Sequence, residues 1–205
     1  MGRSLSGLYE IDTLRVVNCQ GCRLFAGRTQ IVNGSGFAHA AVMFTGEAPG
    51  KAEDRTGVGF QGKAGKIFDA ILGYLGLTRE MIWLNNAVRC RPVHGSKNRT
   101  PKRDEVDACR IWLQRDIDVM APRIIVTLGR IPYESLTGRQ DFTHMRGKPV
   151  EVGALPTVFP LFHPAYLIYR QAARRVMCED LAALARYFDD RRIDHAPPEN
   201  AFCQS

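Results

Sequence analysis

Four short runs of apolar residues recur along the chain, and each ends in polar or turn-forming residues. They cover residues 39–46, 81–88, 123–129 and 157–164. Apolar runs of this length, bounded by glycine, asparagine or proline, are typical of β-strands. The pattern therefore predicts four strands.

The segments between and after these runs repeat their apolar residues every three or four positions, which is the period of an amphipathic helix. The three apolar faces carry Ile67, Ile71, Tyr74 and Leu75, then Val106, Cys109, Leu113 and Ile117, then Met177, Leu181, Leu184 and Phe188. Thr100 is the expected N-cap of the second helix, with Pro101 as its first residue. Residues 193–205 are expected to form a polar tail.

Strands that alternate with helices favour a mainly parallel sheet covered on both faces. We expect a single domain over residues 1–205, an α/β fold of three layers (α/β/α) around a four-stranded, mainly parallel sheet. Ligands of such folds bind outside the carboxyl ends of the strands. Those ends are Gly46-Glu47, Asn85-Asn86, Gly129-Arg130 and His163-Pro164. The candidate site lies where these pairs meet.

The net charge is +7, from 28 basic and 21 acidic residues, and the basic residues are clustered. Residues 89–103 contain basic side chains and no acid, and Arg170, Arg174 and Arg175 form a second group. Such clusters suit a polyanionic partner, and they equally fit two solvated loops. No apolar run has the length of a membrane span, and the first residues lack the apolar core of a signal peptide. We expect a monomeric, cytoplasmic protein without membrane association.

A C-x2-C pair is followed by two single cysteines, giving the set Cys19, Cys22, Cys90 and Cys109. Four thiols suit either Zn²⁺ or a [4Fe–4S] cluster, and their spacing does not choose between the two. For the two single cysteines, burial in the core is the alternative. A disulfide framework is not expected without export. Cys178 and Cys203 have no obvious partners and are predicted to be ordinary thiols.

Several motifs together resemble the family 4 uracil-DNA glycosylases, the iron–sulfur type. In chain order they are GEAPGKAEDRTGVGFQGKAGKIFDAIL, NNAVRCRP with NRTPKRDEVDAC, IIVTLGR and FHPAYL. The resemblance runs from about Cys19 to Arg192. It implies a three-layer α/β/α fold, a [4Fe–4S] cluster held by the four cysteines above, and removal of uracil from DNA to leave free uracil and an abasic site. Activity at the nucleoid is the corresponding expectation.

The motif GEAPG, residues 46–50, has two interpretations: a phosphate-binding loop, or a turn that aims a carboxylate at a substrate. A phosphate loop needs a Gly-Lys-Ser/Thr ending, which is absent here. Glu47, Glu53 and Asp54 place carboxylates in the loop, where they would repel a triphosphate. The carboxylate interpretation is favoured.

The resemblance also assigns roles to single residues. Glu47 orients or activates a water and faces the cationic sugar, while His163 donates a hydrogen bond to a uracil oxygen. The residues it implies for binding the substrate are Gly46, Ala48, Pro49, Gly50, Glu53, Phe60 and Asn86. Among these, Phe60 stacks on the base and the Asn86 amide pairs with the uracil edge. The plainer alternatives are a turn cap for Glu47 and core positions for His163 and Phe60.

A base inside a duplex must be flipped out before an enzyme can reach it. The segment after His163 resembles the family's intercalation loop. The residues expected to meet DNA are Leu167, Ile168, Arg170, Arg99 and Lys97.

Two departures from the family pattern stand out. Tyr169 occupies a position where members often carry arginine. Asn98 stands where a related group that becomes covalently linked to DNA has a nucleophilic histidine, with His94 nearby. The alternatives to a glycosylase are a non-catalytic or covalently trapping DNA-binding protein of the same fold, and a nucleotide-binding α/β protein with structural zinc.

Overall fold

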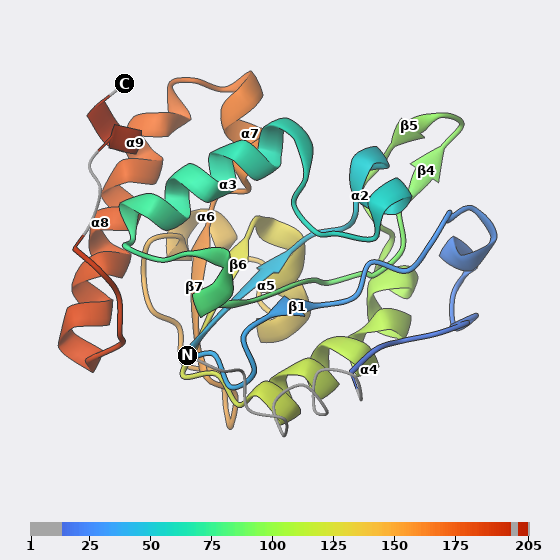
Figure 1. Cartoon of the computed structure of the whole chain (residues 1–205), viewed down its shortest axis with the longest axis horizontal. Helices are drawn as coiled ribbons and strands as arrows, with labels where there is room; N and C mark the ends of the chain where they lie inside the picture. Colours follow the sequence, from blue (N-terminus) through green and yellow to red (C-terminus); the bar gives the residue numbers. More distant parts are fainter. Residues whose placement is uncertain (1–13, 198–200, 205) are drawn as a thin grey trace.

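In the computed structural model, which describes residues 14–197 and 201–204, a β-sheet lies between two layers of helices (Figure 1). The sheet has five strands in the order β1-β3-β2-β6-β7. The strands are β1 (Ser35–Gly36), β2 (Val42–Gly46), β3 (Trp83–Asn86), β6 (Ile124–Leu128) and β7 (Thr157–Leu161). The four predicted strands are confirmed as the parallel part of the sheet.

The fifth strand, β1, is antiparallel to β3 and was not predicted. It is two residues long, which is too short to show an apolar pattern. A Cβ at Gly36 would lie 1.9 Å from the carbonyl oxygen of Ile82, so only glycine permits this close pairing. The expected four-stranded sheet is therefore extended by one short edge strand.

The layers follow from the alternation of side chains along each strand. In β2, Val42 and Phe44 pack into the core beneath α3 (Gly62–Tyr74) and α8 (Ala173–Arg191). Met43 points to the opposite face, against α4 (Arg103–Met120) and α5 (Arg130–Thr137). Because the strands are buried on both faces, they read as continuous apolar runs.

The remaining elements are short. They are η1 (Arg23–Ala26), α2 (Lys51–Thr56), η2 (Arg79–Met81), the hairpin of β4 (Val93–His94) and β5 (Lys97–Asn98), α6 (Phe142–Met145), α7 (Pro164–Tyr169) and α9 (Ala201–Gln204). None of the helices in the described part of the chain has the length and apolar character needed to cross a membrane.

The three predicted helices are present, but the predicted start of α4 is wrong. The helix begins at Arg103 with Lys102 as its N-cap, two residues later than expected. The carboxylate of Glu105 accepts the Lys102 backbone N–H at 2.7 Å and so caps the first turn. Thr100 is thereby left for another contact, described below.

The C-terminal segment departs from the prediction in two ways. Ile193 and Phe202 are buried in the core instead of forming part of a polar tail. Cys178 on α8 and Cys203 on α9 form a disulfide, so the prediction of two ordinary thiols is wrong. The apolar ring of Phe202 brings α9 down against α3 and α8, and this packing places the two sulfurs side by side.

Candidate active site

A cavity of about 520 Å³ opens at the carboxyl ends of β2, β3 and β7. Its lining brings together most of the residues expected to act on or bind a substrate: Glu47, Ala48, Pro49, Gly50, Glu53, Phe60, Asn86 and His163. These residues come from positions far apart in the sequence, and the parallel register of the strands collects them at one edge. This agrees with the general location of ligands in doubly wound sheets.

Gly46 does not line the cavity but makes it possible. A Cβ at this position would lie 2.4 Å from Oδ1 of Asn86 and 2.7 Å from the ring of Phe60. Both neighbours line the cavity, so a side chain at position 46 would push them into the space a ligand needs. Glycine at position 46 thus allows an amide and an aromatic ring to converge on the floor of the site.

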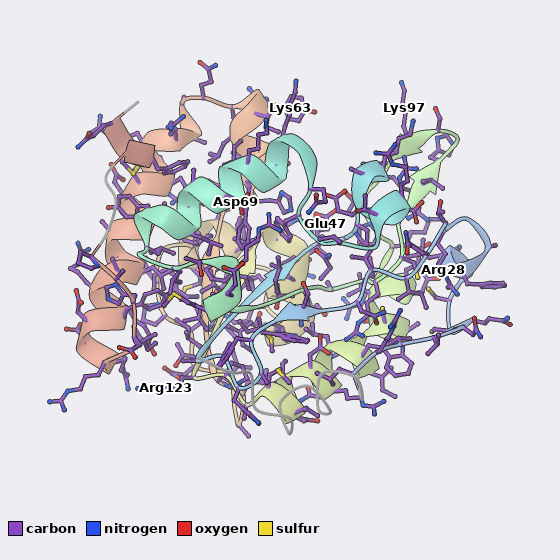
Figure 2. All side chains as sticks on the ribbon, viewed as in Figure 1. Arg28, Glu47, Lys63, Asp69, Lys97 and Arg123 are labelled. Carbon is purple, nitrogen blue, oxygen red and sulfur yellow. A yellow bond between two sulfur atoms is a disulfide. The ribbon has the colours of Figure 1, made fainter. Side chains whose placement is uncertain are left out.

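Glu47 follows β2 directly and lines the cavity; its label in Figure 2 lies between α3 and α2. Burial raises its pKa above the ordinary 4.5, while the hydroxyl of Thr100 and the charge of Arg130 oppose that rise. The net rise makes the carboxylate a better proton acceptor than an exposed glutamate. Sequence reasoning missed both Thr100 and Arg130, because each lies far from residue 47 in the chain.

The other two carboxylates of the motif lie on α2 and bind backbone N–H groups. Glu53 accepts the backbone N–H of Gln61 at 2.8 Å, and the buried Asp54 accepts that of Thr29 at 2.9 Å. Both therefore hold segments of backbone together. Glu53 also lines the cavity, so Glu47 and Glu53 are the two acids of this motif that border the space for a substrate.

His163 caps the N-terminus of α7 and is fixed in one tautomer. Its Nδ1 accepts the backbone N–H of Ala165 at 3.1 Å, so Nδ1 carries no proton and the hydrogen of the neutral ring is on Nε2. Burial lowers the pKa of His163 to about 4. The ring is therefore a neutral hydrogen-bond donor over the whole physiological pH range, with its Nε2–H available to the cavity.

The two neighbouring asparagines at the end of β3 point to opposite faces of the sheet. Asn85 donates to Asp116 at 2.8 Å, on the side of α4, and Asp116 also pairs with the buried Arg89. Asn86 lines the cavity, and within the described residues its amide makes no side-chain hydrogen bond. A buried amide with free donor and acceptor atoms is suited to reading a polar ligand.

Phe60 forms an apolar wall of the cavity. Its ring is 4.7 Å from that of Phe68 and 5.8 Å from that of His163, between centroids, and nearly parallel to the latter. The backbone at Phe60 is left-handed, with φ of 53°, which is uncommon for a bulky residue. The backbone that carries this aromatic ring is thus held in an unusual conformation.

The residues expected to meet DNA are distributed unevenly. Lys97 is exposed on the hairpin at one side of Glu47, and Lys63 on α3 lies at the other side (Figure 2). Arg170 is exposed just after α7. Arg99 lines the cavity but forms a two-pronged ion pair with the buried Glu105, at 2.7 and 2.6 Å.

The segment after His163 folds as a short helix, α7, and this changes which side chains are accessible. Leu167 is only 8% exposed and belongs to the core, and Ile168 lines a separate cavity between α3 and α7. Tyr166 and Tyr169 instead line the main cavity and are 44% and 82% exposed. The periodicity of a six-residue helix was too brief to predict that Leu167 faces inward.

The basic segment 89–103 is likewise not uniformly available to a partner. Arg89 is 3% exposed, and its guanidinium binds the carboxylate of Asp116 at 2.5 Å and the backbone carbonyl of Leu14 at 3.1 Å. This arginine therefore anchors the N-terminal segment to α4. Counting it among the surface charges, as the sequence suggested, was wrong.

The four cysteines Cys19, Cys22, Cys90 and Cys109 line one small cavity between the N-terminal segment and α4. Two N–H groups point at their sulfurs: the Arg28 guanidinium lies 3.6 Å from Cys90 Sγ and the Arg89 backbone N–H lies 3.4 Å from Cys109 Sγ. Burial raises the pKa of Cys109 to about 12 and also raises that of Cys90. Binding iron or zinc here requires deprotonation of these thiols.

In the described ranges, no three His, Cys, Asp or Glu side chains are close enough to share one metal ion. The four thiols surround a common space instead. Four thiols lining one space are the donor set of a [4Fe–4S] cluster and equally that of a structural zinc ion. The residues present therefore fit an iron–sulfur cluster without excluding zinc.

Comparison with known proteins gives a consistent assignment. Residues 34–186 match the Uracil DNA glycosylase superfamily. A type-4 uracil-DNA glycosylase of Saccharolobus solfataricus is 39% identical over 187 residues, covering 87% of this chain and 85% of that protein. That of Sulfurisphaera tokodaii is 38% identical, covering 80% of this chain and 78% of that protein. That of Thermotoga maritima is 36% identical, covering 85% of this chain and 91% of that protein.

The matched region contains the strand ends that carry Glu47, Asn86 and His163 and two of the four cysteines, Cys90 and Cys109. Fold, cavity and sequence similarity therefore agree. The chain belongs to the uracil-DNA glycosylase superfamily and groups with its type-4 members.

Proposed function

We propose that this protein hydrolyses the N-glycosidic bond between uracil and deoxyribose in DNA, releasing uracil and leaving an abasic site. The observation that carries the proposal is the convergence of a carboxylate, a neutral imidazole, an unpaired amide and an aromatic ring on one cavity. Each matches a distinct demand of the reaction. The type-4 relatives, by their printed names, act on uracil in DNA, which supports the same conclusion.

In this reaction the bond from C1′ of the sugar to N1 of uracil breaks, and its electron pair leaves with the base. Positive charge develops on the sugar and negative charge on the uracil ring. The Glu47 carboxylate faces the sugar cation and accepts a proton from the water that adds to C1′. The Nε2–H of His163 donates to a uracil oxygen as its negative charge grows, which favours the transition state over the ground state.

The amide of Asn86 fits the edge of uracil, since its NH₂ donates to O4 while its oxygen accepts N3–H. Cytosine has these donor and acceptor positions reversed, so it would leave buried polar atoms unpaired. Phe60 supplies the face on which the flipped base stacks. When the base flips out, it leaves a gap in the base stack of the duplex. The exposed Tyr169 is more accessible than the buried Leu167 to fill that gap.

Replacing Asn86 by Asp is expected to weaken discrimination against cytosine, because an ionised carboxylate cannot donate to O4. Uracil excision should fall by roughly 10²-fold or more, the penalty for unpaired polar groups in a site built for hydrogen bonding. Single-turnover assays on matched uracil- and cytosine-containing oligonucleotides measure both rates. Unchanged uracil excision by Asn86→Ala would show that another group reads the base.

The rate of excision should fall on the acid side as Glu47 takes up a proton, at a pH above the ordinary glutamate pKa of 4.5. His163 adds no loss in that range, because its pKa of about 4 keeps the ring neutral. A single-turnover pH profile of the wild type and of Glu47→Gln measures this. The acid limb should vanish in the variant, and an identical limb in both proteins would assign it to another group.

We also propose that Cys19, Cys22, Cys90 and Cys109 hold a [4Fe–4S] cluster. The fit of four thiols around one space and the two N–H groups aimed at sulfur support this. The reaction transfers no electrons, so the cluster's contribution here is to link the N-terminal segment to α4. Iron–sulfur clusters are also redox-active, a chemistry that base hydrolysis does not use.

The direct test incubates the purified protein with a uracil-containing oligonucleotide, followed by alkali to cleave abasic sites. Strand cleavage and free uracil are expected, with a thymine-containing oligonucleotide as the control. A covalently trapping protein would instead leave an adduct that survives hot SDS. Asn98, which lines the cavity and accepts a hydrogen bond from Arg91, is a poor nucleophile, so no adduct is expected.

A further inference from the structure

The peptide unit between Phe60 and Gln61 is held from both sides by oppositely charged side chains. Nη2 of Arg79 donates to the carbonyl of Phe60 at 2.7 Å. On the other side, the Glu53 carboxylate accepts the N–H of Gln61 at 2.8 Å. A cation on the oxygen and an anion on the N–H fix the orientation of this one peptide.

These two contacts stabilise a backbone conformation that is otherwise unfavourable, because Phe60 is left-handed. A bulky residue keeps such a conformation only where its surroundings impose it. The backbone of α3 adds a further restraint: a Cβ at Gly65 would lie 2.0 Å from the Phe60 carbonyl oxygen. Glycine lets the helix approach the same carbonyl that Arg79 binds.

Arg79 reaches more than this carbonyl. Its Nη1 donates to the carbonyl of Gly59 at 3.0 Å, and its Nε donates to Asp69 on α3 at 2.6 Å. The guanidinium carbon is also 5.7 Å from the centre of the Phe68 ring, on which Phe60 packs. Arg79 thus supports both the backbone that carries Phe60 and the ring beneath it, without lining the cavity itself.

We propose that Arg79 is a positioning residue for base recognition, acting through the Phe60–Gln61 peptide to fix the ring on which uracil stacks. The inference rests on the proposed function. Glu53, which the sequence predicted to bind the substrate, holds the N–H side of the same peptide. Stacking on a fixed ring stabilises the bound base before and during the reaction alike, so its loss should raise KM more than it lowers kcat.

The test compares Arg79→Gln and Arg79→Lys with a matched control, Arg123→Gln. Arg123 also donates to two backbone carbonyls, those of Arg191 and Arg192, but it precedes β6 at the end of the sheet away from Glu47 (Figure 2). Calorimetric titration with free uracil, KM and kcat on a uracil-containing oligonucleotide, and thermal melts are measured for each. The control separates a loss of stability from a loss of base binding.

Arg79→Gln is expected to weaken uracil binding by about tenfold, within the range that base–aromatic stacking supplies. Arg79→Lys, which can reach one carbonyl, should recover part of this affinity. Arg123→Gln should lower the melting temperature with unchanged uracil affinity. If Arg79→Gln melts below the assay temperature, Arg79→Lys is compared with the wild type and Arg123→Gln in its place.

A double-mutant comparison shows whether Arg79 acts through Phe60. In the Phe60→Ala background, Arg79→Gln should cause no further loss of uracil affinity. A full additional tenfold loss there would overturn the inference, as would wild-type affinity in Arg79→Gln. If the wild type excises uracil and the Arg79 variants bind and excise it equally well, the role of Arg79 is overturned and the proposed function stands. A wild type that neither excises nor binds uracil overturns the proposed function and this inference together.

Discussion

Glu47→Gln is expected to slow excision by a factor on the order of 10²–10⁴, the range typical of a positioned acid–base group. The substitution keeps the shape of the side chain and its capacity to accept from Thr100. It removes the negative charge that faces the sugar cation and the ability to take a proton from water. Affinity for uracil-containing DNA should persist, because phosphate contacts and base stacking are retained.

The same variant should be more stable than the wild type. Since burial raises the folded-state pKa of Glu47 above its unfolded value, its stabilising contribution is complete at acid pH and is lost as the pH rises through the raised pKa. Above that raised pKa the desolvated, ionised carboxylate lowers the stability of the fold, and glutamine removes this cost. This is the usual trade between activity and stability at a site.

Single-turnover rates and thermal melts on one preparation of Glu47→Gln decide between two roles. A slower reaction with a raised melting temperature supports the catalytic role. If Glu47 merely capped a turn, stability would fall by about 0.5–2 kcal/mol and turnover would stay near normal. Turnover within a few-fold of the wild type would contradict the proposed catalytic role.

Cys109→Ala is expected to abolish the brown colour of a [4Fe–4S] protein and to reduce its iron from about four atoms per chain to almost none. The folded yield should fall strongly, because the cluster would close the long loop between residue 19 and residue 109. Excision per folded molecule should change little, since the cysteines lie in a different cavity from Glu47.

Cys203→Ser is the matched control for that experiment. It removes a cysteine outside the cluster cavity and breaks the disulfide to Cys178, so it should keep its iron and colour. Metal analysis and visible spectra measure both variants beside the wild type. A colourless, stable wild type that contains zinc would show that the four thiols serve a different metal.

The sheet was accessible to sequence analysis because its strands are buried on both faces and so appear as uninterrupted apolar runs. Topology then placed Glu47, Asn86 and His163 at one edge, before any coordinates. The tautomer of His163 was not accessible, because it depends on a backbone N–H two residues later whose direction only the folded turn defines. The roles of Thr100, Arg130 and Arg79 required contacts between distant segments.

The differences between expectation and structure have physical causes of the same kind. Leu167 was expected to meet DNA because its segment resembles a loop that enters DNA, and one turn of helix rotates it into the core of the free protein. Arg89 was counted as a surface charge because a sequence does not show that Asp116 lies opposite it. Cys178 and Cys203 meet because α9 returns to pack on α8, which depends on the burial of a single ring, Phe202.

The position of β7 at the edge of the sheet has a consequence for the newly made protein. Glu47 and Asn86 follow strands synthesised in the first half of the chain, whereas His163 follows the last strand to leave the ribosome. Chains commonly begin to fold during synthesis. A nascent chain that has assembled β2, β3 and β6 would therefore present the carboxylate and the amide without the imidazole. The excision proposed above would therefore become possible only once β7, the last strand in the described part of the chain, has joined the sheet.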